Sequence, residues 1–326
     1  MPQAQRKFIA QLVENEEVDE VFLASDKQLR PNRNGNLYLQ MRLSDRTGMV
    51  NSMMWNATDK TYRSFENGDY LRVQGTTQNY NGSLQIIAKQ LEAVAPSSVQ
   101  ESDFVQVSRQ RREELIHQLT EFIRDLENPH LRSLGESLLI QPDLLDDFTR
   151  APAAVKNHHA YQGGLLEHVV NLMQLSRAIA PRYPELNKDL LIAGALLHDI
   201  GKIREMTYDR HLGYTDEGQL VGHLVIGVEI LNELIVAAEK LSAEPFPPEL
   251  AAQLKHMIVS HHGQYEYGSP KVPMTLEAIA LHLLDNLDAK LEHFSQLIHE
   301  DANSDSRWTV YHPALGRKIY KSSEWT

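Results

Sequence analysis

Hydrophobic and polar residues alternate in short runs along residues 18–94. Four runs show this most clearly, at residues 37–43, 49–55, 70–74 and 84–87. Turn signals rich in Asn, Asp and Gly separate the runs, such as Asn34-Gly35-Asn36. A period of two predicts strands with one buried face. Four or five such strands in so short a segment favour a small closed barrel, with a small antiparallel sandwich as the alternative.

The apolar spacing becomes helical from residue 107 onward. Leu115, Leu119 and Leu126 are among the residues that form an apolar face over residues 107–126, and Pro129 interrupts this pattern. Five further helices are predicted at about residues 165–180, 186–200, 218–240, 247–262 and 274–298. The chain is therefore predicted to be multi-domain, with an all-β barrel followed by an all-α domain.

The change of pattern also predicts the domain boundaries. A barrel domain covers residues 1–98, a helical linker region residues 99–150, and a helical domain residues 151–305. Residues 306–326 form a C-terminal tail rich in aromatic and basic side chains, to which the pattern assigns no structure.

Composition narrows the chemistry. The 326 residues include no cysteine, so disulfides and thiolate metal sites are excluded and any metal must use nitrogen and oxygen ligands. No signal peptide or membrane-length apolar run is visible, so we expect a cytoplasmic protein without a membrane partner. The net charge of −12 argues against simple nucleic-acid binding. Residues 21–90, however, hold nine basic and five acidic residues.

Seven residues of metal-ligand type recur along the helical half: His168, His198, Asp199, His223, His261, His262 and Asp285. The pair His198-Asp199 ends the most apolar predicted helix, which places it at the floor of a core-lined cavity. A buried carboxylate such as Asp285 is costly unless it is paired or bound to a metal. Residues three apart share a helix face, so His282, Asp285 and Asp288 should point together. One His on an apolar face is usually a hydrogen-bonded core residue, but the whole set on successive helices predicts a metal site.

The order of these residues resembles the HD superfamily of metal-dependent phosphohydrolases over roughly residues 150–300. In that family the order H…HD…D holds one ion, which here corresponds to His168, His198, Asp199 and Asp285. Further histidines hold a second ion, and His223 and His261 occupy these positions. His262 could replace or join His261, or orient it through a hydrogen bond. The resemblance implies two divalent ions bridged by Asp199, with Mn²⁺ preferred and Mg²⁺, Co²⁺, Fe²⁺ or Zn²⁺ as alternatives.

Other residues near these ligands are candidates for contact with a phosphate. Lys202 lies three residues beyond Asp199 and is predicted to meet a phosphate oxygen or stabilise the transition state, or else to be a solvated Lys at a helix end. His158, His159 and Tyr161 precede two glycines that permit close backbone approach. They could contact phosphate or stack on a base, or simply cap the helix.

The barrel offers a basic and aromatic surface for a single strand. Arg30, Arg33 and Tyr80 lie near predicted loops, whereas Tyr38 and Trp55 lie in alternating strands and could face either way. The whole chain then resembles the YhaM-type 3′→5′ exoribonucleases, which combine an OB-fold domain with an HD domain. The matching stretches include residues 34–39, 45–48, 158–168, 198–202 and 261–263.

This resemblance implies release of nucleoside monophosphates from the 3′ end of single-stranded RNA, with single-stranded DNA as a further substrate. Asp199 and Lys202 are the predicted catalytic residues. A small-nucleotide phosphohydrolase and a non-catalytic nucleic-acid-binding module are the alternatives, and a di-iron oxygenase is a remote one. The sequence leaves the oligomeric state open, a homo-oligomer included.

Overall fold

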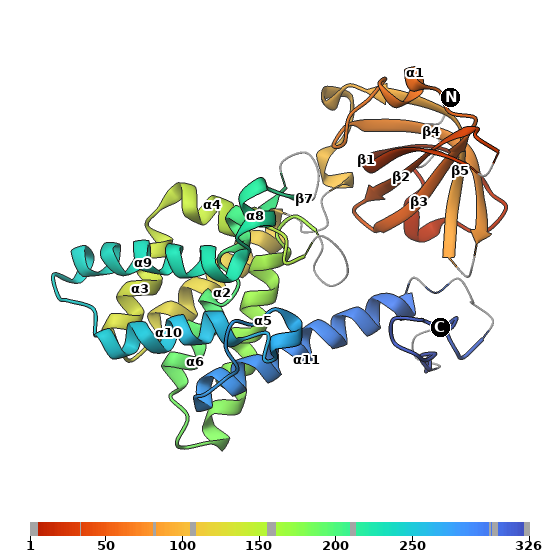
Figure 1. The fold of residues 1–326 in the computed structure, drawn as a ribbon. Helices are drawn as coiled ribbons and strands as arrows, with labels where there is room; N and C mark the ends of the chain where they lie inside the picture. The colour runs from red at the N-terminus through yellow and green to blue at the C-terminus, as the bar shows by residue number, and fades with distance from the viewer. Residues whose placement is uncertain are drawn as a thin grey trace. The chain divides into compact units, whose positions relative to one another are not determined.

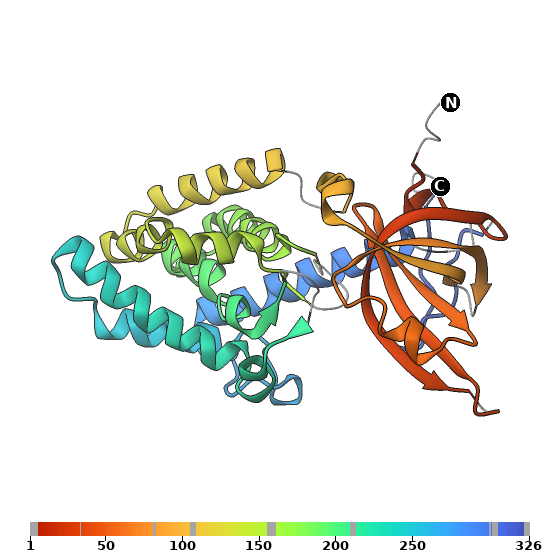
Figure 2. The same cartoon turned by 90° about the horizontal axis from the view of Figure 1, so that it is seen from above.

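The structure is a computed structural model (Figures 1 and 2). It describes residues 6–32, 34–80, 83–104, 109–154, 161–208, 213–299, 301 and 306–322. Contacts between residues divide the chain into two compact units. The first comprises Met1–Gln106, Asp209–His211 and Phe294–Thr326, and the second Val107–Tyr208 and Leu212–His293.

A closed barrel of five strands forms most of the first unit (Figure 1). Its strands are β1 (Glu17–Pro31), β2 (Leu37–Asp45), β3 (Gly48–Trp55), β4 (Tyr70–Tyr80) and β5 (Ser83–Val94). They follow the order β1-β2-β3-β5-β4, in which β1 pairs with both β2 and β4 and a parallel contact joins β3 to β5. The short helix α1 (Asp59–Tyr62) lies between β3 and β4 in the chain. The predicted barrel is confirmed, and the sandwich alternative is wrong.

Alternating side chains fill the barrel. Phe22, Leu39, Leu43, Leu71 and Ile86 are fully buried, and they come from strands in which buried and more exposed side chains largely alternate. Burying one such side chain stabilises the fold by about 1.5–3 kcal/mol. The period of two in the sequence therefore arises because every second side chain points into this core.

The first strand is the one to which the sequence pattern gave no bounds. Its register shifts between Ser25 and Gln28, and Asp26 adopts a positive φ of 52°. The bulge turns the Lys27 side chain inward, where its Nζ donates to the carbonyl oxygen of Tyr62 at 3.0 Å. The bulge interrupts the alternation of apolar and polar residues along β1. The buried lysine adds a polar residue at an inward position, so the sequence pattern did not mark this strand.

The second unit is built from helices. They are α2 (Arg109–Arg124), α3 (Pro129–Leu139), α4 (Pro142–Arg150), α5 (Gly164–Ile179), α6 (Lys188–Leu197), α7 (Lys202–Glu205), α8 (Asp216–Leu220), α9 (His223–Ser242), α10 (Pro248–Ser260) and α11 (Leu276–His299). Helices α9 and α10 lie side by side in both views (Figures 1 and 2). Two short strands, β6 (Met206–Thr207) and β7 (Gly213–Tyr214), pair within this otherwise helical unit.

Helix α6 lies at the centre of the helical core. Its residues from Asp189 to Leu197 are all buried, and the side chain of Asn187 caps its start by accepting from the backbone N–H of Leu190 at 3.0 Å. Leu115 and Leu119 of α2 pack in the same core. The segment 107–150 therefore packs with the helical unit.

Local signals explain where the observed helices end. The predicted helix 218–240 is two helices, because Gly222 between α8 and α9 has a φ of 80° that ends the first. Among the described residues, no helix is long and apolar enough to cross a membrane.

Candidate metal centre

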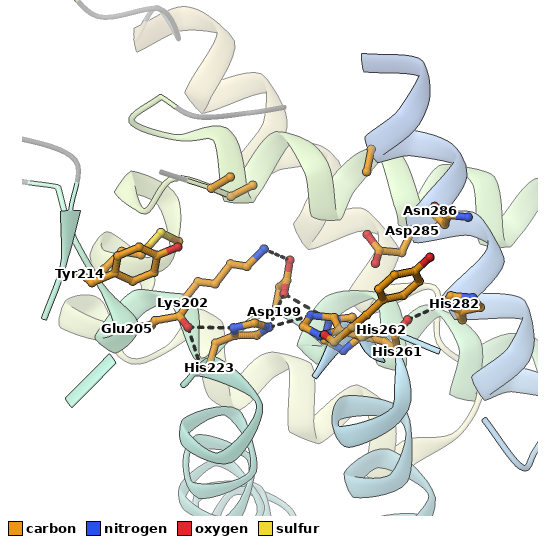
Figure 3. Close-up of a pocket in the computed structure, with 15 residues that line it drawn as sticks. Asp199, Lys202, Glu205, Tyr214, His223, His261, His262, His282, Asp285 and Asn286 are labelled. Carbon is orange, nitrogen blue, oxygen red and sulfur yellow. Dashed lines mark hydrogen bonds and ion pairs between the residues drawn. The ribbon is translucent and has the colours of Figure 1, made fainter. Parts of the chain in front are cut away.

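The seven predicted ligands come from three helices and from the turns that follow two others. His168 lies on α5, His223 is the first residue of α9, and Asp285 lies on α11. The pair His198-Asp199 follows the last residue of α6, and the pair His261-His262 follows the last residue of α10. All seven belong to the second unit, and five of them surround one pocket (Figure 3).

One group of candidate ligands contains His168, His198 and Asp285. Their candidate ligand atoms lie within 4.8 Å of one another. The Nε2 atom of His168 is 3.2 Å from Nε2 of His198 and 3.3 Å from Oδ1 of Asp285. Both histidines are buried, so an ion bound here would be largely shielded from solvent.

A second group contains His223, His261 and His262, again within 4.8 Å of one another. The Nε2 atoms of His223 and His262 are 3.2 Å apart. Sequence reasoning left open whether His261 or His262 belongs to the site. The structure brings both imidazoles to the same group.

The carboxylate of Asp199 lies between the two groups. Its Oδ2 atom is 3.3 Å from Nε2 of His198 and 3.8 Å from Nε2 of His168. Its Oδ1 atom is 3.5 Å from Nε2 of His261 and 3.7 Å from Nε2 of His223. Oδ1 is buried and accepts no hydrogen bond from any residue that the structure describes. Each oxygen therefore faces a different histidine group, as a bridging ligand requires.

The outer nitrogens of the five histidines show that the inner ones are available. Each Nδ1 lies within hydrogen-bonding distance of an oxygen acceptor, which in a neutral ring places the proton there and leaves the Nε2 lone pair directed inward. Neutral rings whose Nε2 atoms are 3.2 Å apart would repel each other unless a proton or a metal ion lies between them, so the donor set fits divalent ions. The acceptors, in chain order of the histidines, are Asp288 (2.7 Å), Ala195 (2.9 Å), Glu205 (3.0 Å), Ile258 (2.8 Å) and Tyr267 (3.0 Å).

Two of these acceptors are carboxylates that were not among the predicted site residues. Asp288 lies one turn beyond Asp285 on α11, and the predicted shared face of α11 was the signal that could have identified it. Glu205 ends α7 and accepts from both the backbone N–H and the ring of His223 at 3.0 Å. Its position in the sequence carries no comparable signal, because only the close packing of α7 on α9 brings it to His223.

Electrostatics differ between the two groups. Burial alone would lower the pKa of His168, but the carboxylates of Asp285 and Asp288 outweigh it and raise the pKa to about 9. Burial lowers the pKa of His261 to about 4. Burial would raise the pKa of Asp199, but the charges of Lys202 and His198 hold it well below its usual range. At neutral pH the second group therefore offers a neutral imidazole, whereas His168 must release a proton to bind an ion.

Lys202 is part of the centre. It is the first residue of α7, and its Nζ donates to Oδ2 of Asp199 at 2.5 Å. Its side chain is only 14% exposed, so the solvated alternative considered above is wrong. Figure 3 shows Lys202 and Glu205 on one side of Asp199, with Asp285 and His282 on the other.

Close backbone contacts hold the two turns in place. A Cβ on Gly201 would lie 2.0 Å from the carbonyl oxygen of His223, so only glycine lets the turn after Asp199 approach α9. A Cβ on Gly263 would lie 2.1 Å from the ring of His282. That ring donates from Nδ1 to the carbonyl oxygen of His261 at 2.7 Å and so ties the second turn to α11.

A pocket of about 400 Å³ opens over the centre. Its floor is made of polar ligand residues, and its walls include Ala153, Ala154, Tyr214 and Tyr267. Ligand pockets commonly begin at about 300 Å³, so this one suits a small polar group with one ring system attached.

The remaining predicted substrate contacts have mixed outcomes. His158, His159 and Arg33 lie outside the described residues. Tyr161 donates its hydroxyl to Glu167 at 2.6 Å and is half-buried. On the barrel, Arg30 and Tyr80 are exposed, and the half-buried ring of Tyr38 lies 5.5 Å from that of Trp55. Trp55 is itself about half exposed, so the aromatic pair faces outward where β2 begins and β3 ends.

Comparisons with known proteins agree with this geometry. Residues 165–290 match the family of the HD domain, and residues 23–94 match the family described as OB-fold nucleic acid binding domain. The chain thus combines an N-terminal OB-fold nucleic-acid-binding domain with an HD domain, the domain of a superfamily of metal-dependent phosphohydrolases. HD domains bind divalent metals, and the histidine and aspartate groups described above lie within the matched segment.

Two solved structures show weaker likenesses. The second OB-fold domain of replication protein A from Methanococcus maripaludis is 19% identical, with a TM-score of 0.23, and the match covers 29% of this chain and 100% of that one. Asparaginyl-tRNA synthetase from Pyrococcus horikoshii is 10% identical, with a TM-score of 0.24, and the match covers 72% of this chain and 59% of that one.

Proposed function

We propose that this protein is a metal-dependent 3′→5′ exoribonuclease of the YhaM type, which degrades single-stranded RNA to nucleoside monophosphates and also accepts single-stranded DNA. The observation that carries the proposal is the position of Asp199, whose two oxygens face two different histidine groups. A carboxylate between two ligand groups suits a phosphodiesterase that uses two metal ions. The nucleic-acid-binding barrel in the same chain would bind a polymeric substrate for it.

The residues present would hold two ions. His168, His198 and Asp285 would bind one, His223, His261 and His262 the other, and Asp199 would bridge them; we propose Mn²⁺ for both. When bound, such ions supply a hydroxide near neutral pH and neutralise charge on the phosphoryl oxygens. Asp288 and Glu205 orient the histidine rings from outside, which keeps the inner nitrogens in place.

Lys202 has a role that follows from its contact with Asp199. Its ammonium group lies on Oδ2, the oxygen that faces His168 and His198. A lysine and a divalent ion on one carboxylate oxygen would repel each other, whereas Lys202 also lines the pocket and could extend its ammonium group into it. There its positive charge would meet a phosphate oxygen and stabilise the charge that develops during cleavage.

Pocket size supports cleavage at an end. The volume of about 400 Å³ suits one terminal nucleotide better than an internal segment of a nucleic-acid strand. The barrel would hold the strand further from the end through its outward aromatic side chains, Trp55 and Tyr80, and through Arg30. The net charge of −12 leaves the metal centre and the barrel as the main sites of affinity.

An end-labelled substrate tests the proposal. Purified protein with Mn²⁺ and 5′-labelled single-stranded RNA should give a ladder that shortens one nucleotide at a time from the 3′ end. Asp199→Ala should abolish both the ladder and the bound metal, as measured by elemental analysis, because it removes the shared ligand. Asp143→Ala, which removes an exposed carboxylate on α4, is the matched control. Internal cleavage products, or no cleavage with any divalent ion, would contradict the proposal.

A second candidate is a phosphohydrolase of small nucleotides. It is favoured by the composition of the pocket, since every residue that lines it belongs to the helical unit. Release of inorganic phosphate from free nucleotides, at a rate that single-stranded RNA does not inhibit, would favour this candidate over the exonuclease.

A further inference from the structure

The C-terminal tail, residues 306–322, forms a small hairpin. Trp308 pairs with Tyr320 and His312 with Arg317 in antiparallel bridges. Backbone hydrogen bonds from Thr309 to Ile319 (2.9 Å) and from Lys321 to Arg307 (2.7 Å) join its two arms. We call residues 306–322 the tail hairpin.

The inner face of the tail hairpin is held in place. Thr309 and Ile319 are buried, and the backbone N–H of Ile319 also donates to the hydroxyl of Thr309 at 3.0 Å. Lys321 is buried as well and forms an ion pair with Asp301 at 2.7 Å. These contacts fix which side chains must point outward.

The outer side chains are aromatic. Trp308, Tyr311 and Tyr320 are 50%, 56% and 48% exposed. The rings of Trp308 and Tyr320 pack edge to face with centroids 5.2 Å apart. Among the described residues of the tail hairpin, every exposed large hydrophobic side chain is an aromatic one. Exposed rings recur in protein interfaces, but they also form the platforms on which the bases of a single strand stack.

Charge favours the same occupant. The tail hairpin contains four basic residues and no acidic one, in a chain whose net charge is −12. Lys321 is neutralised by Asp301, but Arg307, Arg317 and Lys318 are exposed. Arg317 also lies 5.5 Å from the ring centroid of Phe294. A polyanion with flat rings matches this surface, and single-stranded nucleic acid combines both properties.

We propose that the tail hairpin is a second binding site for single-stranded nucleic acid, separate from the barrel strands. Bases stack on Trp308 and Tyr320, and phosphates are met by Arg317 and Lys318. The proposal rests on the proposed function only in taking a single strand as the substrate. The site adds affinity for a long strand and takes no part in cleavage.

Binding without turnover tests the tail hairpin. Full-length protein in EDTA is titrated into a fluorescein-labelled, unstructured RNA of about 20 nucleotides, longer than one OB fold covers, and fluorescence anisotropy gives Kd. Trp308→Ala and Tyr320→Ala should each raise Kd about tenfold, because each removes a stacked base. Trp308→Phe keeps a stacking ring and should stay within about threefold of the unmodified protein. Tyr183→Ala removes an equally exposed tyrosine from the helical unit and should leave Kd unchanged.

The cationic residues have a separate signature. The double variant Arg317→Ala/Lys318→Ala should lower the slope of log Kd against log salt concentration by about 1.4, because each lost phosphate contact on a single strand contributes about 0.7. Arg182→Ala/Lys240→Ala removes two exposed cations from the helical unit and serves as the charge-matched control. Thermal unfolding of each variant verifies that the fold is retained.

Several results would overturn this proposal. Unchanged Kd in Trp308→Ala and Tyr320→Ala would do so, as would an equal loss of affinity in the control variants. A change of mass in light scattering with unchanged Kd would instead assign the tail hairpin to contact between copies of the chain. Because EDTA prevents turnover, failure of the exonuclease proposal leaves these binding results unaffected, and the two can be distinguished.

Discussion

The five histidines of the centre use their two ring nitrogens for different purposes. In each ring Nδ1 meets an oxygen acceptor. Nε2 faces a carboxylate of Asp199 or Asp285 in four of the rings and faces Nε2 of His223 in the fifth, His262. Three of the acceptors are backbone carbonyls, which cannot be removed by a side-chain substitution. The two carboxylates, Asp288 and Glu205, are therefore the positions at which the orientation of a ring can be tested.

Asp288→Ala should weaken metal binding without unfolding the protein. It removes the acceptor 2.7 Å from Nδ1 of His168, so the ring is free to rotate, and loss of such a partner typically lowers metal affinity about 10–100-fold. Competition with a metal-indicator dye measures the affinity. Asp288→Asn retains an acceptor oxygen and should restore part of it. If Asp288→Ala bound metal as tightly as the unmodified protein, the positioning role would be wrong.

Metal binding should release a proton from His168. Its pKa in the metal-free protein is about 9, above the ordinary 6.5, so its charged form stabilises the fold fully below about pH 6.5, and this contribution is lost as the pH rises through about 9. An ion bound at Nε2 displaces that proton. Calorimetry between pH 7 and 8, in two buffers of different ionisation enthalpy, should show release of about one proton. Equal apparent enthalpies in both buffers would contradict this prediction.

At the scale of elements, two helices end in the same way. His198 directly follows α6 and His261 directly follows α10, and each ring hydrogen-bonds from Nδ1 to the carbonyl oxygen three residues earlier, in Ala195 and Ile258. A second ligand, Asp199 or His262, follows immediately. Helix α6 is buried throughout and α10 packs one face in the core, so their ends deliver four ligands to one place.

Gly201→Ala should disrupt the turn after α6. The new Cβ would lie 2.0 Å from the backbone oxygen of His223. Because this contact is with backbone, relieving it would require α9 or the turn itself to move. We therefore expect a loss of about 3 kcal/mol in the free energy of unfolding. Gly194→Ala is the matched control, since its Cβ would meet the flexible end of Met257 at the same 2.0 Å and also gains helix propensity. Urea unfolding compares the two. Equal stabilities would show that the contact between Gly201 and α9 is not limiting.

At the scale of the whole molecule, the segment that holds the barrel and the rest of the chain carry different charges. Residues 101–326, which include the metal ligands, hold the acidic excess with 21 basic and 33 acidic residues, whereas residues 1–100 contain 11 of each. Part of that excess is the carboxylates of the metal centre, which bound cations would offset. The neutral N-terminal half is thus the better surface for a polyanion.

Tyr80→Ala should separate strand binding from chemistry. Tyr80 is 60% exposed at the end of β4, and loss of one stacked base corresponds to about 1–3 kcal/mol. We expect KM for an RNA of about 20 nucleotides to rise at least fivefold, while hydrolysis of a dinucleotide is unchanged. Steady-state kinetics on both substrates measure this. Equal effects on the long RNA and the dinucleotide would show that Tyr80 of the barrel does not contribute to binding of the strand.

Much of the fold follows from local patterns. The period of two in β2 to β5 and the apolar faces of the long helices were visible because each strand or helix buries one continuous face. The hydrophobic pattern did not predict features that depend on unusual backbone geometry. The bulge at Ser25–Gln28 obscured β1, and the positive φ of Gly222 divided one predicted helix into two. The tail hairpin was also missed, because it has only two isolated bridges and too short a buried face to produce a period.

The sequence alone determined the kinds of residue in the centre and the helices that carry them, because ligand chemistry and helix periodicity are local properties. The resemblance in the sequence implied how those ligands divide between two ions, and only the tertiary structure shows the contacts among them. Asp199 turns one oxygen to each histidine group, and Asp288 and Glu205 orient rings that belong to other helices. Both features depend on how α5, α7, α9 and α11 pack around α6. Packing distances between segments far apart in the chain leave no regular spacing in the sequence, so only the folded structure shows them.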